Sequence, residues 1–193
     1  WLTWTKPKGL LRAEEYDQLR LFFAATHGKL WTRHDRWGEG DPCEEGNAWY
    51  GISCFNPCNS AIDGEACGYA RIQTIIMPNN NLYGTIPKDF FRLVRNLSIV
   101  DLSHNELSGS IPTEVRHLRN IDDFSMGHNL ISGHIPLELS HLGGGAATKL
   151  DLGNNLISGA LPTELSSLSS LEYLRVGMTK ISGTLPDSTP KCF

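Results

Sequence analysis

The segment LSHNELSGSIPTEV, residues 102–115, decides the fold of this chain. Extended upstream to Leu97, it gives the pattern L-x-x-L-x-L-x-x-N-x-L-x-G-x-I-P, which fits the sequence five times. The ninth positions of the five copies follow one another at intervals of 24 to 26 residues, at Asn80, Asn105, Asn129, Asn155 and Thr179. Eight aligned positions repeated five times at one spacing predict a solenoid of stacked coils.

The repeat gives each residue type a physical role. No single coil can bury the apolar positions 1, 4, 6, 11 and 15, so coils stacked at about 4.8 Å must share one core. Positions 3 to 7 predict a short strand, and the five strands predict a parallel sheet on the concave side. The position-9 asparagines should hydrogen-bond backbone groups of the neighbouring coil, which would cost about 1–3 kcal/mol each if buried unpaired. The predicted ladder is Asn80, Asn105, Asn129 and Asn155, and Thr179 replaces the asparagine where no further coil follows.

This repeat resembles the plant-type leucine-rich repeat, which builds polygalacturonase-inhibiting proteins and the ectodomains of receptor-like kinases. The resemblance implies an α/β fold, a right-handed leucine-rich-repeat solenoid of five repeats. It also implies that the L-S-G-x-I-P half forms a second, shorter sheet. We expect an N-terminal cap at residues 1–69, the repeats at 70–187 and a remnant of a C-terminal cap at 188–193.

The N-terminal cap has its own signals. Residues 13–26 predict an amphipathic helix, because large apolar side chains recur at helical spacing. The segment CEEGNAWYGISC at 43–54 resembles the family's cap motif C-x-W-x-G-V-x-C, with extra residues before the tryptophan. The tryptophans of the cap, Trp31, Trp37 and Trp49, favour a buried cap core over a sugar-binding platform.

Four of the five cysteines, Cys43, Cys54, Cys58 and Cys67, lie in one short stretch, whereas Cys192 stands near the end. Such a cluster predicts two disulfides and an oxidising compartment, and the spacing lacks the paired C-x-x-C of a zinc site. Against the family motif, Cys58 and Cys67 are additional, and we interpret them as a second disulfide on an inserted loop. Asn96-Leu97-Ser98 is a sequon, so Asn96 is a predicted glycosylation site.

Composition limits the possible functions. The net charge is -4, and no cluster of lysine and arginine suits nucleic acid. The longest apolar stretch, around residues 19–25, is too short to span a bilayer. No signal peptide opens the sequence, so we expect that a secreted form begins after cleavage. Because motifs such as G-x-S-x-G, H-E-x-x-H and G-x-G-x-x-G are missing from the sequence, we expect no enzyme activity, cofactor or metal.

The exposed strand positions and the adjoining position 8 form the expected binding face. Their side chains include an acidic centre, a histidine pair and a C-terminal edge with residue types common at interface hot spots. The histidine pair could also make a pH-sensitive contact or part of a metal site, although a polar ladder is favoured. The predicted partner-binding residues are Asp101, Asp123, Ser125, His104, His128, Asp151, Lys149, Tyr173 and Arg175.

Together these features predict a secreted or cell-surface recognition module that binds a protein or peptide through the concave face and one flank. Five strands offer roughly 400–500 Å², below the ~800 Å² per partner of a standard interface, so we expect weak binding, a small ligand or a larger assembly. The alternative is a structural or adhesive component of a cell wall or matrix. A hydrolase inhibitor or an ice-binding protein is less favoured, since the array is short and its threonine row is interrupted at His134 and Ala160.

Overall fold

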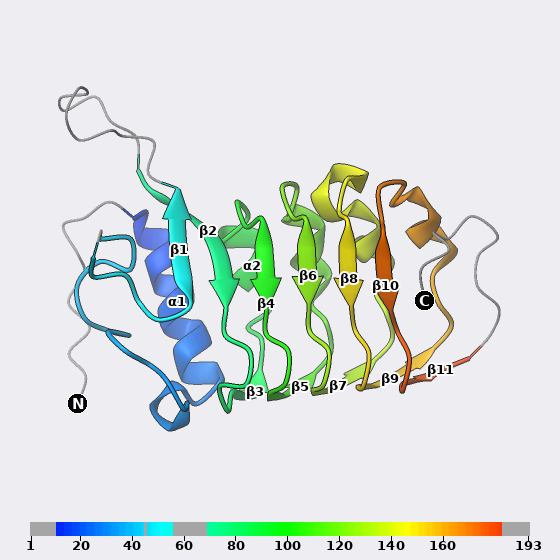
Figure 1. The fold of residues 1–193 in the computed structure, drawn as a ribbon, viewed down its shortest axis with the longest axis horizontal. Helices are drawn as coiled ribbons and strands as arrows, with labels where there is room; N and C mark the ends of the chain where they lie inside the picture. The colour runs from blue at the N-terminus through cyan, green and yellow to red at the C-terminus, as the bar shows by residue number, and fades with distance from the viewer. Residues whose placement is uncertain (1–10, 45, 56–68, 183–193) are drawn as a thin grey trace.

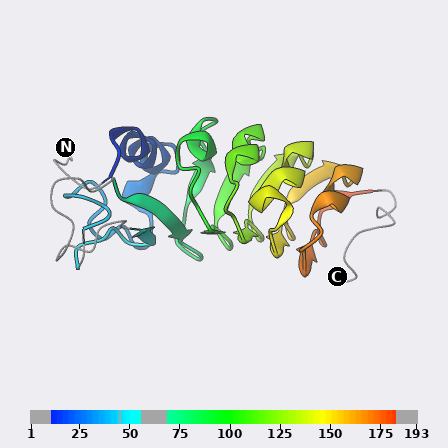
Figure 2. The ribbon, with the colours of Figure 1, turned by 90° about the horizontal axis from the view of Figure 1, so that it is seen from above.

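The computed structural model describes residues 11–44, 46–55 and 69–182, and within them the coils stack side by side along one axis (Figure 1). The first strand of each coil contributes to a six-stranded sheet, and short helical turns lie behind it (Figure 2). In spatial order this sheet contains β1 (Ile52–Phe55), β2 (Arg71–Ile76), β4 (Ile99–Asp101), β6 (Asp123–Ser125), β8 (Lys149–Asp151) and β10 (Tyr173–Arg175).

The five strands from the repeats are parallel and in register, as the sequence predicts. For example, Thr74, Ile75 and Ile76 pair with Ile99, Val100 and Asp101. The sixth strand, β1, was not predicted; it comes from the cap and pairs antiparallel with β2. It covers the N-terminal edge of the sheet, where unpaired backbone groups would otherwise be open to association.

A second sheet follows from the L-S-G-x-I-P half of each coil, as the family resemblance implies. Its strands are β3 (Tyr83–Thr85), β5 (Glu106–Gly109), β7 (Leu130–Gly133), β9 (Leu156–Gly159) and β11 (Lys180–Ile181). The convex side of the repeats carries short helical turns, each of which follows the proline of its L-S-G-x-I-P segment. They are α2 (Phe90–Leu93) and the 3-10 segments Thr113–His117, Leu137–Gly145 and Thr163–Ser167.

The predicted inward positions form one continuous core. Val100, Leu102 and Leu107 of the second coil have no exposed surface, and the equivalent side chains of the neighbouring coils are buried against them. Burying each such side chain contributes about 1.5–3 kcal/mol. The three glycines of Leu137–Gly145 lie on the convex side. There Gly143 has a φ of 58° and approaches the Ile121 carbonyl oxygen too closely to admit a Cβ atom.

The cap begins with α1 (Ala13–Ala25), which matches the predicted helix. Its apolar face packs on an aromatic cluster in which Trp31, Trp37 and Trp49 are at most 3% exposed. Each indole nitrogen donates to a backbone carbonyl; that of Trp37, for example, lies 2.9 Å from the Tyr50 oxygen. These buried rings are core and cannot act as a sugar platform. A short 3-10 turn, Gly28–Leu30, follows α1.

One predicted disulfide is present, between Cys43 and Cys54. It links the loop between Trp37 and Trp49 to β1. Because it closes a short loop of the unfolded chain, it stabilises the fold by about 2–3 kcal/mol in the chain-entropy model. Cys58, Cys67 and Cys192 lie outside the described residues, as does the expected C-terminal remnant at 188–193.

The position-9 asparagines connect each coil to the one before it. Asn129 accepts a hydrogen bond from the Leu107 backbone nitrogen at 2.9 Å, and its Nδ2 donates to the Leu102 carbonyl at 3.0 Å. Asn105 and Asn155 repeat this arrangement with their own preceding coils. Asn80, in the first coil, exchanges bonds with the backbone of Arg33 in the cap.

This direction corrects the explanation that the sequence suggested for Thr179. We expected threonine there because no later coil needs an asparagine, yet the asparagines serve the earlier coil. Thr179 bonds only within its own coil among the described residues, donating to the Val176 carbonyl at 2.7 Å and accepting from the Ile181 nitrogen at 3.3 Å.

Glu15 is the unexpected member of the cap core. The sequence places it in the acidic start of α1, but it is only 3% exposed because it falls on the same face as Leu19 and Phe22. Its Oε2 has no hydrogen-bond partner among the described residues. Burial raises the pKa of Glu15 to about 7, against the opposing effects of a hydrogen bond from Asn96 and of nearby arginines.

Replacing Glu15 by glutamine should therefore stabilise the protein above neutral pH. Between the ordinary pKa of 4.5 and about 7, the folded state holds a proton that the unfolded chain has lost, so stability falls as pH rises through this window. At about pH 8, Glu15→Gln should raise the free energy of unfolding by about 1–3 kcal/mol and flatten this slope. Urea unfolding followed by circular dichroism at several pH values measures both effects.

The matched control is Glu14→Gln, because Glu14 is exposed on the same turn of α1. It should change stability by less than about 0.5 kcal/mol. An unchanged slope in Glu15→Gln would show that Glu15 ionises in the folded state as it does in the unfolded chain.

Candidate functional site: the concave face and its flank

The concave sheet carries rows of charged side chains whose charges largely neutralise one another. Asp123 and Lys149 occupy the same position in the adjacent strands β6 and β8, and Lys149 Nζ lies 2.9 Å from Asp123 Oδ2. Partial burial lowers the pKa of Lys149, but its bond to Asp123 and the charges of Asp101 and Asp151 outweigh this, so the pKa is raised overall. This ion pair therefore fixes the positions of both side chains on the concave face.

A second pair lies one strand further along. Arg175 NH1 is 3.6 Å from Asp151 Oδ2, and Asp151 Oδ1 accepts from the Gly153 nitrogen at 2.9 Å. The Asp151 residue is nearly buried, at 9% exposed, and these contacts satisfy its carboxylate. The expected acidic centre is weaker than the sequence suggested, because two of its carboxylates are paired with cations.

Ser125 must be removed from the predicted contact residues. It is 2% exposed, and its hydroxyl donates to Asp123 Oδ1 at 2.7 Å, so a partner cannot reach it. Asp101 remains accessible: it accepts two bonds from Ser103 and forms no ion pair with the described residues. Tyr173 is 41% exposed at the C-terminal edge of the sheet.

Position 8 of the coils forms a row along the flank, where the chain leaves the concave sheet. We call this the flank row; its members are Asn79, His104, His128, Asn154 and Met178. All five have left-handed backbones, with φ between 52° and 55°. Asparagine and histidine adopt this conformation more readily than most residues, which gives a backbone reason for their recurrence.

The two histidines of the flank row stack on each other, as the repeat spacing predicts. Their ring centroids are 4.0 Å apart and their planes differ by 13°. Asn154 Nδ2 lies 3.1 Å from His128 Nε2. Partial burial, His104 and Arg175 lower the pKa of His128, and the Asp151 carboxylate only partly opposes them. Within the described part of the chain, no three metal-ligating side chains converge.

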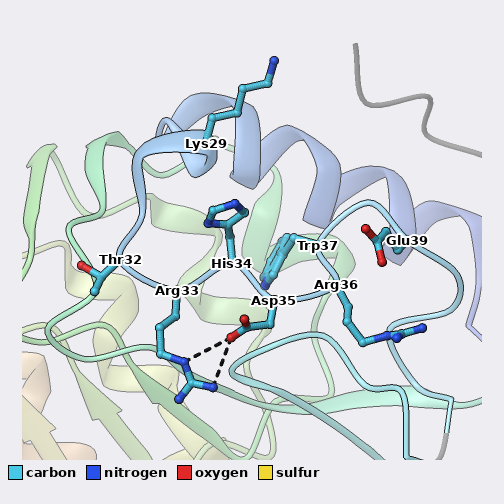
Figure 3. Close-up of a pocket in the computed structure, with 8 residues that line it drawn as sticks. All are labelled: Lys29, Thr32, Arg33, His34, Asp35, Arg36, Trp37 and Glu39. Atoms are coloured by element: carbon cyan, nitrogen blue, oxygen red, sulfur yellow. Dashed lines mark hydrogen bonds and ion pairs between the residues drawn. The ribbon is translucent and has the colours of Figure 1, made fainter.

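One hollow adjoins the flank row and a second lies in the cap. The first, of about 440 Å³, is lined by Thr32, Asn79, Asn81, His104, Asn105, Glu106 and His128. The other, of about 480 Å³, lies in the cap, where Thr32 also lines it (Figure 3). Lys29, Arg33, His34 and Arg36 surround the cap hollow, with Trp37 in its wall.

The cap hollow was not predicted from the sequence, although the density of basic residues between positions 29 and 36 was a usable signal. Arg33 is partly neutralised there, since its NH2 lies 3.1 Å from Asp35 Oδ2 and its guanidinium lies 4.0 Å above the ring of Tyr50. Lys29 points away from the other labelled side chains (Figure 3).

The predicted glycosylation residue Asn96 lies between α2 and β4 and is half-buried. Its side chain hydrogen-bonds Glu15, so the amide nitrogen that would carry a glycan faces the cap helix. Glycosylation at Asn96 stays a prediction. No helix in the described residues is long and apolar enough to cross a membrane.

Comparisons with known proteins agree with this architecture. The family described as Leucine Rich Repeat matches residues 96–118 and 147–168. Over 63 residues, 33% of the chain, the sequence is 33% identical to Receptor-like protein 6 from Arabidopsis thaliana. That stretch is 6% of the relative, so the chain spans only a small part of its length.

Solved structures extend the similarity to nearly the whole chain. The ectodomain of the receptor kinase SOBIR1 from Arabidopsis thaliana matches with a TM-score of 0.74 and 24% identity, covering 92% of this chain and 86% of that one. The plant peptide hormone receptor RGFR1, solved in complex with RGF2, matches with a TM-score of 0.53 and 36% identity, covering 56% of this chain and 17% of that one. Repeat sequence, fold and cap thus agree: the chain has the leucine-rich-repeat fold and is similar to the ectodomains of plant receptor kinases.

Proposed function

We propose that this chain is an extracellular recognition module that binds a protein or peptide partner through its concave face and the adjoining flank. The observation that carries the proposal is the arrangement of the concave face. Rigid parallel strands hold Asp101 and Tyr173 accessible, and the partly exposed pairs of Asp123 with Lys149 and Asp151 with Arg175 add fixed charges. Such fixed side chains on regular elements favour binding because little entropy is lost on association.

The extracellular location rests on two observations. The Cys43–Cys54 disulfide is typical of an oxidising compartment. The chain also resembles the ectodomain of the receptor kinase SOBIR1 and, over part of its length, the plant peptide hormone receptor RGFR1 in complex with RGF2. A peptide or protein partner for this chain is inferred from that resemblance together with the shape and charges of its face.

The size of the face suggests how it acts. The five repeat strands present only roughly 400–500 Å², about half of the ~800 Å² that each partner buries in a standard interface, and β1 adds one further strand. A short peptide fits this area, and a larger partner must also contact the flank or the cap. Binding as one component of a larger assembly is consistent with this size.

Substitutions on the concave face test the proposal. The double variant Asp101→Lys with Tyr173→Ala should reduce specific partner capture from extracellular fluid by at least about tenfold, as measured by affinity purification and quantitative mass spectrometry. Both side chains are accessible, so the fold should survive. Glu164→Lys, on the convex side, is the control and should capture the same partner as the unmodified protein.

If the concave double variant retained full capture and Glu164→Lys lost it, the convex surface would be the binding face. That outcome would support a structural or adhesive role through the outer surfaces instead.

A further inference from the structure

The flank row and its hollow differ from the concave face in shape and chemistry. Coils repeat every ~4.8 Å, so the four polar members of the flank row span ~14 Å, the length of about four extended residues. At each step an amide or imidazole points outward, and the row adjoins the hollow of about 440 Å³. Regular donors and acceptors of this kind suit the backbone of an extended peptide.

The charges beside the flank row select the side chains of such a peptide. Two carboxylates belong to the same coil as His104: Glu106 lines the hollow together with both histidines, and Asp101 lies three residues before His104 in the chain. Neither forms an ion pair with any residue in the described ranges. A lysine or arginine of the partner could therefore pair with them, and this match of charges is the reason for a basic peptide.

The electrostatic charge along the two adjoining hollows changes from negative beside the flank row to positive in the cap. The cations Lys29, Arg33 and Arg36 line the second hollow, which meets the first at Thr32, and the carboxylates of Asp35 and Glu39 offset part of this charge. The remaining positive charge disfavours a basic side chain there, so the basic residues of a ligand should lie over the second and third coils. This change in charge fixes where along the flank the peptide sits.

We infer that the flank row binds an extended peptide segment bearing lysine or arginine, and that protonation of the His104–His128 stack releases it. The inference rests on the proposed function, to which it adds a partner chemistry and a regulation.

The geometry of the stack explains the release. Asn154 Nδ2 donates to His128 Nε2 only while that nitrogen is unprotonated. A proton on either ring places a positive charge in the hollow that Glu106 also lines, where the ligand's cation would bind, and a second proton would charge two rings whose centroids are 4.0 Å apart. Protonation therefore competes directly with a basic ligand.

The other groups facing the stack come from every neighbouring element. Asn79 and Asn81 come from the first coil, Thr32 from the cap and Asn154 from the fourth coil. Asp151 and Arg175, which act on His128, form their own ion pair. Glu106 is thus the carboxylate that lines the hollow and forms no ion pair with the described residues, and Asp101 of the same coil also forms none.

The chain itself supplies the control for the imidazoles. Asn79 and Asn154 hold the same left-handed conformation as the two histidines, so His104→Asn with His128→Asn places a residue that this backbone already accepts. The double variant keeps a polar row but removes both imidazoles.

The experiment sorts a displayed library of random peptides of about eight residues against the purified chain at about pH 8, and then measures the bound peptides at about pH 8 and pH 5. Enriched peptides should carry lysine or arginine and bind at least about tenfold more weakly at the lower pH. Glu106→Gln should weaken them by about threefold to tenfold at the higher pH. The double asparagine variant should bind within about twofold at both pH values.

The outcomes separate this inference from the proposed function. Peptides that lose affinity in Tyr173→Ala, but not in Glu106→Gln, would place binding on the concave sheet and overturn the flank site alone. Enrichment of acidic peptides, or a pH dependence that persists in the double asparagine variant, would also overturn it. A library that yields no binder would contradict both proposals for peptide ligands.

Discussion

Replacing Asn129 by alanine should lower the free energy of unfolding by about 3–5 kcal/mol. The substitution leaves the Leu107 nitrogen and the Leu102 carbonyl of the preceding coil without this partner, and it also removes the bonds to the Met126 and Gly127 carbonyls. These groups lie in the buried seam between two coils, where water cannot replace the lost bonds at no cost. Urea unfolding followed by circular dichroism measures the loss.

Asn120→Ala is the matched control, because Asn120 is exposed in a turn on the other side of the coil. Its effect should stay within about 0.5 kcal/mol. If Asn129→Ala cost less than about 1 kcal/mol, the asparagine would not be a main connection between coils.

Trp37→Ala should destabilise the protein by a similar amount, about 3–5 kcal/mol, through the cap. The Trp37 ring lies at the centre of the aromatic cluster, with centroids 4.9 Å from Trp31, 5.0 Å from Trp49 and 5.6 Å from Phe23. Alanine leaves a cavity there and strands the Tyr50 carbonyl that accepts from the indole nitrogen. Denaturant unfolding and hydrogen exchange of α1 should both report the loss.

Phe55→Ala serves as the comparison, because this phenylalanine is 57% exposed at the end of β1. It should cost less than about 1 kcal/mol. Equal losses in the two variants would mean that the aromatic cluster is no better packed than the surface.

The repeat pattern predicted most of the fold because its constraint is periodic. An aliphatic residue such as Leu102 recurs at the same position in every coil, and only stacking can bury all of these side chains together. The helix of the cap was also predictable from the sequence, since its apolar side chains recur at helical spacing. The strand β1 was not, because four residues of alternating burial carry little signal until β2 is present to pair with them.

The binding face was predictable as a set of positions but not as a set of interactions. The shared repeat position of Asp123 and Lys149 was visible in the sequence and could have identified their ion pair. The burial of Ser125 could not be predicted in this way, because the repeat position alone does not show that its hydroxyl is only 2% exposed and donates to Asp123. Glu15 shows the same limit, since its acidic side chain suggests solvent while its place on the helix buries it.

Each position-9 asparagine bonds the coil or cap that precedes it in the chain, and this direction affects the order in which the protein folds during synthesis. During synthesis the cap emerges first, and each later coil delivers the amide that completes its predecessor. Assembly can therefore proceed from the amino end without waiting for the rest of the chain, and a chain interrupted after any coil has only its newest turn unfinished. The protein should accordingly begin to fold while still attached to the ribosome, in the order in which its coils are translated.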